Sequence, residues 1–108
     1  MVGKYKILFV DDDANFLSGT HRLLRNLHDE WDLTFAESVD QAVELARIQP
    51  PDAVVSDYHM PLKNGFDLVC EMRAMPAVQD APIIIVTGDT DETAKRKALD
   101  RLLKKSLI

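Results

Sequence analysis

The sequence has little cysteine, no long apolar run and no excess of positive charge. Its single cysteine, Cys70, can form no internal disulfide, and its helical surroundings predict a buried core thiol. No apolar run approaches the roughly 18 residues that a membrane-spanning helix needs. The net charge of -5 argues against a nucleic-acid-binding surface. These absences leave a cytoplasmic protein as the expectation, one that binds neither membranes nor, directly, nucleic acid.

Length and composition predict one ordinary globular domain. Hydrophobic residues make up 46% of the chain and charged residues 29%, which is typical of a folded protein and not of a disordered one. A chain of 108 residues is long enough to bury one hydrophobic core without the help of disulfides or structural metal ions, and it is too short to form two cores. We therefore expect a single domain over residues 1–108, with no linker, repeat or low-complexity segment.

Short apolar runs alternate with amphipathic segments along most of the chain. Several runs lack polar alternation, as expected for parallel strands with both faces covered. The predicted strands cover residues 6–10, 33–36, 53–56 and 82–87. The predicted helices cover residues 14–28, the segment from the N-cap Ser38 to Pro50, and a segment opening near Gly65 that carries Phe66, Leu68, Val69 and Met72. This order predicts an α/β fold, a doubly wound parallel sheet with helices on both faces.

Carboxylates stand at the ends of two predicted strands. Asp11, Asp12 and Asp13 follow the first strand directly, and Asp57 follows the third. Because parallel strands finish at the same edge of a sheet, several negative charges would gather there at a cost without a counter-ion. Magnesium prefers oxygen ligands and is held by one or two carboxylates together with phosphate oxygens. The pattern predicts a Mg²⁺ site of Asp12 and Asp57 with Asp11 acting through water, whereas Asp13 would face solvent at the helix start.

The same edge could support phosphoryl transfer. A carboxylate can attack phosphorus to form an acyl phosphate while a metal ion screens its charge. Asp57, alone at its strand end, is the better candidate for the nucleophile. Thr87 could donate its hydroxyl to a phosphoryl oxygen, and a lysine could supply a matching positive charge. Taken alone, Thr87 fits a helix cap about equally well.

The order of these motifs resembles the response-regulator receiver domain. Residues 6–13 resemble the opening acidic motif of that family, residues 57–65 its phosphoacceptor loop and residues 87–88 its switch position. The resemblance covers about residues 5–98. It implies a flavodoxin-like sheet of order 2-1-3-4-5. The resemblance also implies that the protein is not an enzyme for other substrates and catalyses only its own phosphorylation and dephosphorylation.

The resemblance implies a role for each candidate residue. Asp57 would accept a phosphoryl group from a histidine kinase or phosphotransfer protein. Asp11 and Asp12 would hold Mg²⁺ together with Asp57, and His59 would contribute its backbone carbonyl. Thr87 would swing towards the phosphate and alter a partner-binding surface, which could serve a fused or separate output domain.

The C-terminal residues depart from the family pattern. Receiver domains continue with a fifth strand ending in Lys-Pro and a fifth helix, whereas residues 89–108 favour one long amphipathic helix. Two alternatives stay open. Residues 102–106 could form the fifth strand, with Lys105 or Lys104 binding phosphate, or residues 101–108 could be a remnant of the fifth helix. We expect these elements to be shortened, rearranged or missing, with residues 99–108 atypical and the exposed edge available for a homodimer.

Three other functions fit parts of the pattern. A receiver-like scaffold that binds partners without taking phosphate is the first. A haloacid-dehalogenase-like phosphatase is the second, but its motif needs threonine or valine where Asn15 follows Asp11 and Asp13. An EF-hand loop is the third, but Phe16 stands in its glycine position and Arg22 in its glutamate position.

Overall fold

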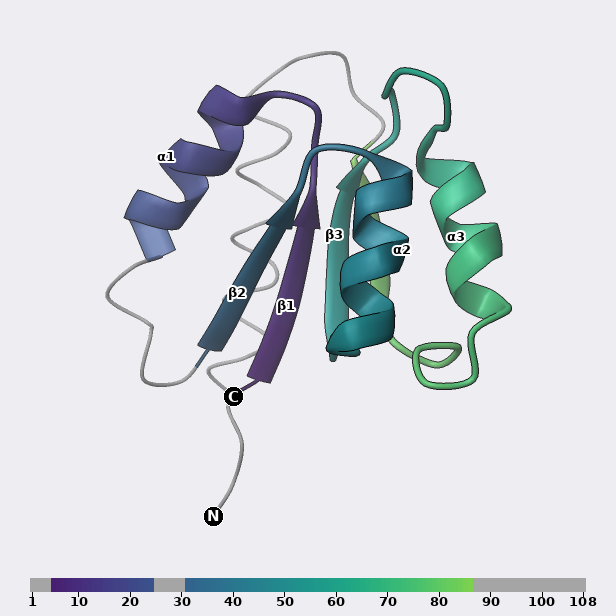
Figure 1. Ribbon diagram of the computed structural model, residues 1–108. Helices are drawn as coiled ribbons and strands as arrows, with labels where there is room; N and C mark the ends of the chain where they lie inside the picture. Colours follow the sequence, from purple (N-terminus) through teal and green to yellow (C-terminus); the bar gives the residue numbers. More distant parts are fainter. Residues whose placement is uncertain (1–4, 25–30, 87–108) are drawn as a thin grey trace.

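A computed structural model describes residues 5–24 and 31–86 of the chain. Strands and helices alternate strictly through these residues (Figure 1). The strands are β1 (Tyr5–Val10), β2 (Trp31–Ala36), β3 (Ala53–Asp57) and β4 (Ile83–Val86). The helices are α1 (Ala14–Leu24), α2 (Val39–Ile48) and α3 (Gly65–Arg73).

The strands form one parallel sheet in the order β2-β1-β3-β4. Phe9 of β1 lies opposite Phe35 of β2 on one side and Val55 of β3 on the other, and Asp57 of β3 lies opposite Val86 of β4. The chain leaves β1 towards β2 and later returns to place β3 on the other side of β1, which creates a switch point between β1 and β3. The doubly wound fold with strand order 2-1-3-4 is confirmed. The predicted fifth strand and helix fall outside the described residues.

Helices cover both faces of the sheet, with α1 on one side and α2 and α3 on the other (Figure 1). Alternate side chains of a strand point to opposite faces. Accordingly, Leu8 and Val10 join the core beneath α2 and α3, whereas Ile7 and Phe9 join the core beneath α1. All four side chains are at most 1% exposed. Two buried faces explain why the first strand is apolar without alternation.

The expectation that Cys70 is a core thiol is wrong, because Cys70 is exposed. The Phe66 side chain of the same helix, α3, is also 63% exposed. The helix instead buries Leu68 and Met72, four residues apart and therefore on one face. Cys70 lies two residues from each of them, which places it on the opposite side of the helix. The apolar residues of this helix therefore extend beyond the face that it buries.

The other elements agree with the sequence to within a few residues. Trp31 opens β2 and is 2% exposed, so this strand begins earlier than expected and its tryptophan belongs to the core. Ser38 caps α2 as predicted, because its hydroxyl oxygen accepts a hydrogen bond of 3.1 Å from the Gln41 backbone N–H. The predicted first helix is confirmed as far as Leu24. Among the described residues, no helix has the length and apolar character needed to cross a membrane.

Candidate metal site at the carboxyl edge of the sheet

Three carboxylates meet where β1 and β3 end. Val10 lies opposite Ser56 in the parallel register, so the next residue of each strand, Asp11 and Asp57, reaches the edge beside the other. The Asp11 N–H also donates to the Ala36 carbonyl at the end of β2, at 3.0 Å. One carboxylate oxygen each from Asp11, Asp12 and Asp57 lies within 4.8 Å of the other two. The cluster expected from the sequence is therefore present.

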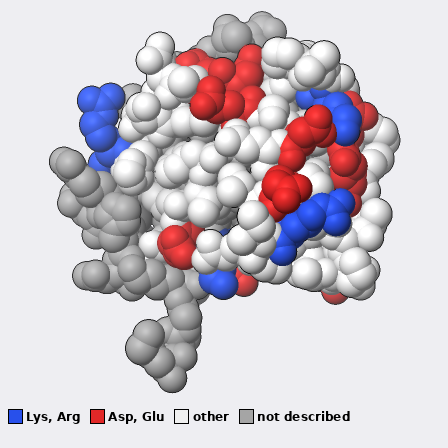
Figure 2. All heavy atoms as spheres, viewed as in Figure 1, with Lys and Arg blue, Asp and Glu red and all other residues white. Residues whose placement is uncertain are grey.

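The cluster has a buried side and an open side. Asp11 is 2% exposed and Asp57 is 8% exposed, whereas Asp12 is exposed to solvent. Figure 2 shows acidic side chains gathered along the upper edge of the molecule, over the carboxyl ends of the strands in Figure 1. Closely spaced carboxylate oxygens suit a hard divalent cation, and Mg²⁺ keeps coordination positions for water or phosphate oxygens. The residues present therefore fit Mg²⁺.

Asp13 has a different role from its two neighbours, as the sequence predicted. Its carboxylate oxygen accepts hydrogen bonds from the backbone N–H groups of Asn15 and Phe16, at 3.0 and 3.2 Å. These bonds cap the start of α1, where the helix dipole favours a negative charge. The Asp13 N–H itself donates to the Asp11 carboxylate at 2.9 Å. A cap formed by Asp13 speaks against the phosphatase and EF-hand alternatives, both of which need this carboxylate for another purpose.

The start of α3 packs directly against the end of β3. The Gly65 N–H donates to the Tyr58 carbonyl at 2.9 Å. A Cβ atom on residue 65 would lie 3.0 Å from the Tyr58 Cα and 3.1 Å from the Asp57 carbonyl oxygen, which is tighter than most contacts of real Cβ atoms. A larger residue here would therefore require the neighbouring backbone to shift by a few tenths of an ångström. The sequence predicted that Gly65 opens a helix and ends the loop that follows Asp57. The close approach of Gly65 to the end of β3 depends on the tertiary packing.

A capping box fixes the same turn. The Asn64 side chain accepts from the Asp67 N–H at 3.0 Å, and the Asp67 carboxylate accepts from the Asn64 N–H at 2.9 Å. These reciprocal bonds satisfy backbone donors that the first helical turn would otherwise leave without partners. The helix start is thus held in place beside Asp57.

His59 lies in the loop between β3 and α3. Its imidazole is exposed and meets the Tyr58 ring edge to face, with centroids 5.0 Å apart. The proposed contribution of His59 to a metal site involves its backbone carbonyl, which stays a prediction. The other candidate residues, Thr87, Lys104 and Lys105, lie outside the described residues, and their roles stay predictions as well.

Apolar side chains surround the buried part of the cluster. A small hollow beside Asp11 and Asp57 is lined by the following further residues: Phe9, Val10, Phe16, Val55, Ser56 and Val86. The Ser56 hydroxyl donates to the Asp57 carbonyl at 2.9 Å, so this buried polar side chain is satisfied within its own strand. Charges act more strongly on one another in such surroundings than in water. A cation bound beside Asp11 and Asp57 would therefore be attracted to their carboxylates more strongly than in water.

Comparison with known proteins identifies the class to which this fold and site belong. Residues 7–107 match the family described as response regulator receiver domain. A response regulator receiver protein of Anaeromyxobacter sp. (strain Fw109-5) is 35% identical over 102 residues, which cover 93% of this chain and 42% of that protein. The transcriptional regulatory protein KdpE of Staphylococcus aureus is 33% identical over 96 residues, which cover 88% of this chain and 39% of that protein. The chain belongs to the response regulator receiver domain family, and it spans less than half the length of these two relatives.

Solved structures agree with this assignment. The receiver domain of the sensor histidine kinase PA1611 from Pseudomonas aeruginosa, with a magnesium ion coordinated in its active site cleft, aligns with a TM-score of 0.71 and 29% identity. The alignment covers 81% of this chain and 70% of that one. The chemotaxis response regulator CheY4 of Vibrio cholerae aligns with a TM-score of 0.73 over 87% of this chain and 77% of that one. At 24% identity, CheY4 shows a common fold.

Proposed function

We propose that this receiver domain takes a phosphoryl group onto Asp57 with the help of Mg²⁺. The donor would be a histidine kinase or a phosphotransfer protein, and the added charge would switch the binding of a partner. The observation that carries this proposal is the meeting of Asp11, Asp12 and Asp57, whose carboxylate oxygens lie within 4.8 Å of one another. The domain would act in the cytoplasm and would catalyse no reaction beyond its own phosphorylation and dephosphorylation.

Each residue of the edge has a part in the proposed reaction. A carboxylate oxygen of Asp57 attacks the phosphorus atom, the bond from phosphorus to the donor breaks, and an acyl phosphate forms. The carboxylates of Asp11, Asp12 and Asp57 and the His59 carbonyl would hold Mg²⁺, whose charge would offset the repulsion between Asp57 and the incoming phosphoryl oxygens. The exposure of Asp12 leaves the solvent side of the cluster open to a donor.

One experiment tests this proposal directly. The protein is incubated with Mg²⁺ and acetyl phosphate, and the intact mass is measured. We expect a gain of one phosphoryl group that is abolished by Asp57→Ala and by chelation of the metal ion. Asp13→Asn is the matched control, since asparagine also caps helices and Asp13 lies outside the cluster. An unmodified wild-type protein would reject the proposal and favour the scaffold that binds partners without phosphate.

The larger assembly is also a proposal. The two relatives extend well beyond the part that this chain matches, which supports an output domain, fused or separate, as the target of the switch. We propose in addition that two copies pair through the β4 side of the sheet, where Ile83, Ile84 and Ile85 are half-buried. A single monomeric mass in light scattering over a wide concentration range would exclude such a dimer.

A further inference from the structure

The loop from Asp57 to α3 is exposed in its middle. The Leu62 side chain is fully exposed, and its backbone adopts a φ of 71°, in the left-handed region that a leucine enters only at a cost. Met60, half-buried, packs against the core beneath α2 and α3. The Lys63 N–H donates to the Pro61 carbonyl at 2.8 Å, which closes a tight turn around Leu62. A loop with strained backbone and exposed side chains needs further contacts to stay in one conformation.

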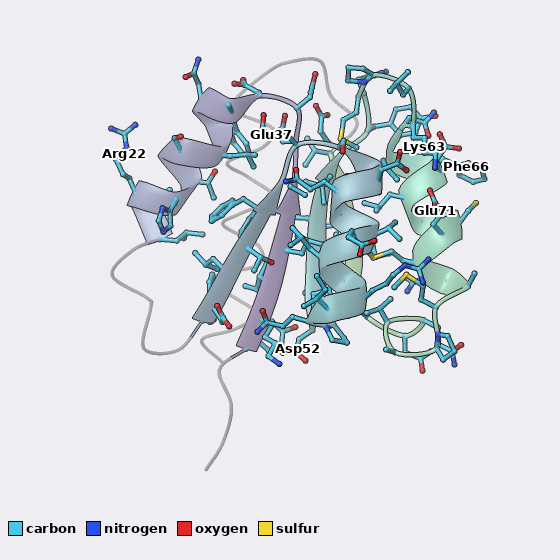
Figure 3. The ribbon with its side chains drawn as sticks, in the orientation of Figure 1. Arg22, Glu37, Asp52, Lys63, Phe66 and Glu71 are labelled. Carbon is cyan, nitrogen blue, oxygen red and sulfur yellow. The ribbon has the colours of Figure 1, made fainter. Side chains whose placement is uncertain are left out.

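Lys63 supplies such contacts to two helices at once. Its ammonium nitrogen lies 2.8 Å from an Asp40 carboxylate oxygen in the first turn of α2 and 3.3 Å from a Glu71 carboxylate oxygen in α3. Figure 3 shows the labelled Lys63 and Glu71 side chains on the side of the molecule where α2 and α3 lie. The loop is thereby joined to both helices on that side of the sheet.

The charge of Lys63 is secured by the same two partners. Hydrogen bonds to Asp40 and, less strongly, to Glu71 raise the pKa of the Lys63 ammonium above its ordinary value of 10.5. The lysine is therefore charged at neutral pH. Because its ammonium is held by these carboxylates, Lys63 is not offered to a phosphoryl group at Asp57 in this conformation.

We infer that Lys63 is a positioning residue for the candidate metal site. By pairing with α2 and α3 together, it holds the loop that contains His59 in place beside Asp11, Asp12 and Asp57. This inference rests on the proposed function, since it concerns the same Mg²⁺ site. Exposed ion pairs add little to global stability, but the order of a surface loop is a local equilibrium in which small contributions change populations. A site formed only in part of the population binds its ligand correspondingly less tightly.

The sign of the effect separates positioning from simple electrostatics. Lys63→Met removes a positive charge from an acidic surface, and Coulomb attraction alone would then strengthen the binding of Mg²⁺. Positioning predicts weaker binding. Arg47→Met is the matched control, because Arg47 is an exposed cation of α2 and no salt bridge involves it among the described residues. Lys63→Arg keeps the positive charge. This variant tests whether a cation that can still pair with Asp40 and Glu71 is enough to keep the affinity for Mg²⁺.

The test combines calorimetric titration of Mg²⁺ with backbone amide exchange and thermal unfolding. For Lys63→Met we expect roughly three- to tenfold weaker Mg²⁺ binding, the range that two exposed ion pairs can supply. We also expect faster exchange of the Lys63 and Gly65 amides, which close the loop, and an almost unchanged Tm. Lys63→Arg should bind close to wild type, and Arg47→Met as tightly as wild type or more so. The same titrations in an Asp57→Asn background report any ion bound elsewhere.

Each outcome decides one of the two claims. If wild type binds Mg²⁺ and Lys63→Met binds equally well or more tightly, the inference is wrong and the proposed function stands. If Lys63→Met weakens binding only together with a large fall in Tm, Lys63 has a general structural role and the inference is again wrong. If wild type binds no Mg²⁺, the proposed function fails and the inference fails with it.

Discussion

Aspartates stand at both edges of the sheet, but they are arranged differently. At the amino edge, the Asp52 carboxylate accepts from the Lys6 N–H at 2.7 Å, and the Asp52 N–H donates to the Lys6 carbonyl at 2.8 Å. At the carboxyl edge, Asp11, Asp12 and Asp57 bring their oxygens within 4.8 Å of one another. The Asp52 carboxylate is used to join β1 to the start of β3. The clustered carboxylates are those that would hold the proposed Mg²⁺.

The largest expected effect distinguishes the two edges by their response to Mg²⁺. A ligand that binds only the folded state stabilises it by about 2.7 kcal/mol at a hundredfold excess over its Kd. We expect this increment for wild type, and we expect Asp57→Asn to lose it because one of the clustered carboxylates is gone. Urea unfolding with and without Mg²⁺ measures the difference. Asp52→Asn should keep the full increment, and an equal loss in both variants would contradict a local site.

The next effect concerns the close packing at the carboxyl edge. Gly65→Ala would place a Cβ atom 3.0 Å from the Tyr58 Cα, and the backbone shift should cost about 1–3 kcal/mol of unfolding free energy. Gly19→Ala is the matched control, because a Cβ atom there would meet nothing within 4 Å. In the middle of α1, alanine should stabilise by about 0.5–1 kcal/mol. Similar unfolding free energies for both variants would show that the edge is not tightly packed.

A smaller effect is expected at the amino edge. Asp52→Ala removes the acceptor of the Lys6 N–H and should cost about 1 kcal/mol, the contribution of a typical hydrogen bond. Its affinity for Mg²⁺ should equal that of wild type, because Asp52 lies at the opposite edge of the sheet. Calorimetric titration checks the affinity and urea unfolding checks the stability. A lower affinity would mean that the two edges are coupled.

The smallest effect is the pH dependence that Lys63 contributes. Its pKa is raised in the folded state, so the stability that it adds is fully present below the ordinary value of 10.5 and is lost as the pH rises through the folded-state pKa. The difference in unfolding free energy between wild type and Lys63→Met should therefore shrink as the pH rises above the ordinary value of 10.5. Comparing the two proteins cancels the titration of other groups. A difference that grows with pH would contradict the pairing with Asp40 and Glu71.

The candidate site was largely predictable because it depends on strand ends. An apolar run that stops at an aspartate marks both the strand and the residue that leaves it, and parallel strands share one edge. Asp11, Asp12 and Asp57 were predicted together on this ground, and the structure brings them together. The capping role of Asp13 was predictable as well, because it follows from local helix geometry.

Contacts between helices were not predictable in the same way. The exposed positions of Phe66 and Cys70 depend on how much of α3 faces α2 and the sheet. The pairing of Lys63 with Asp40 joins residues 23 positions apart in the sequence. Neither follows from periodicity, since helical spacing says which residues share a face and not how wide a contact that face makes.

The sequence by itself determined the alternation of strands and helices, the family resemblance and the gathering of acidic residues at one edge. These features follow from local periodicity and from the common direction of parallel strands. The tertiary structure decided which side of α3 is buried, how closely residue 65 approaches the end of β3 and which carboxylates pair with Lys63. Those outcomes depend on the distances between elements remote in the sequence, and such distances exist only once the elements have packed.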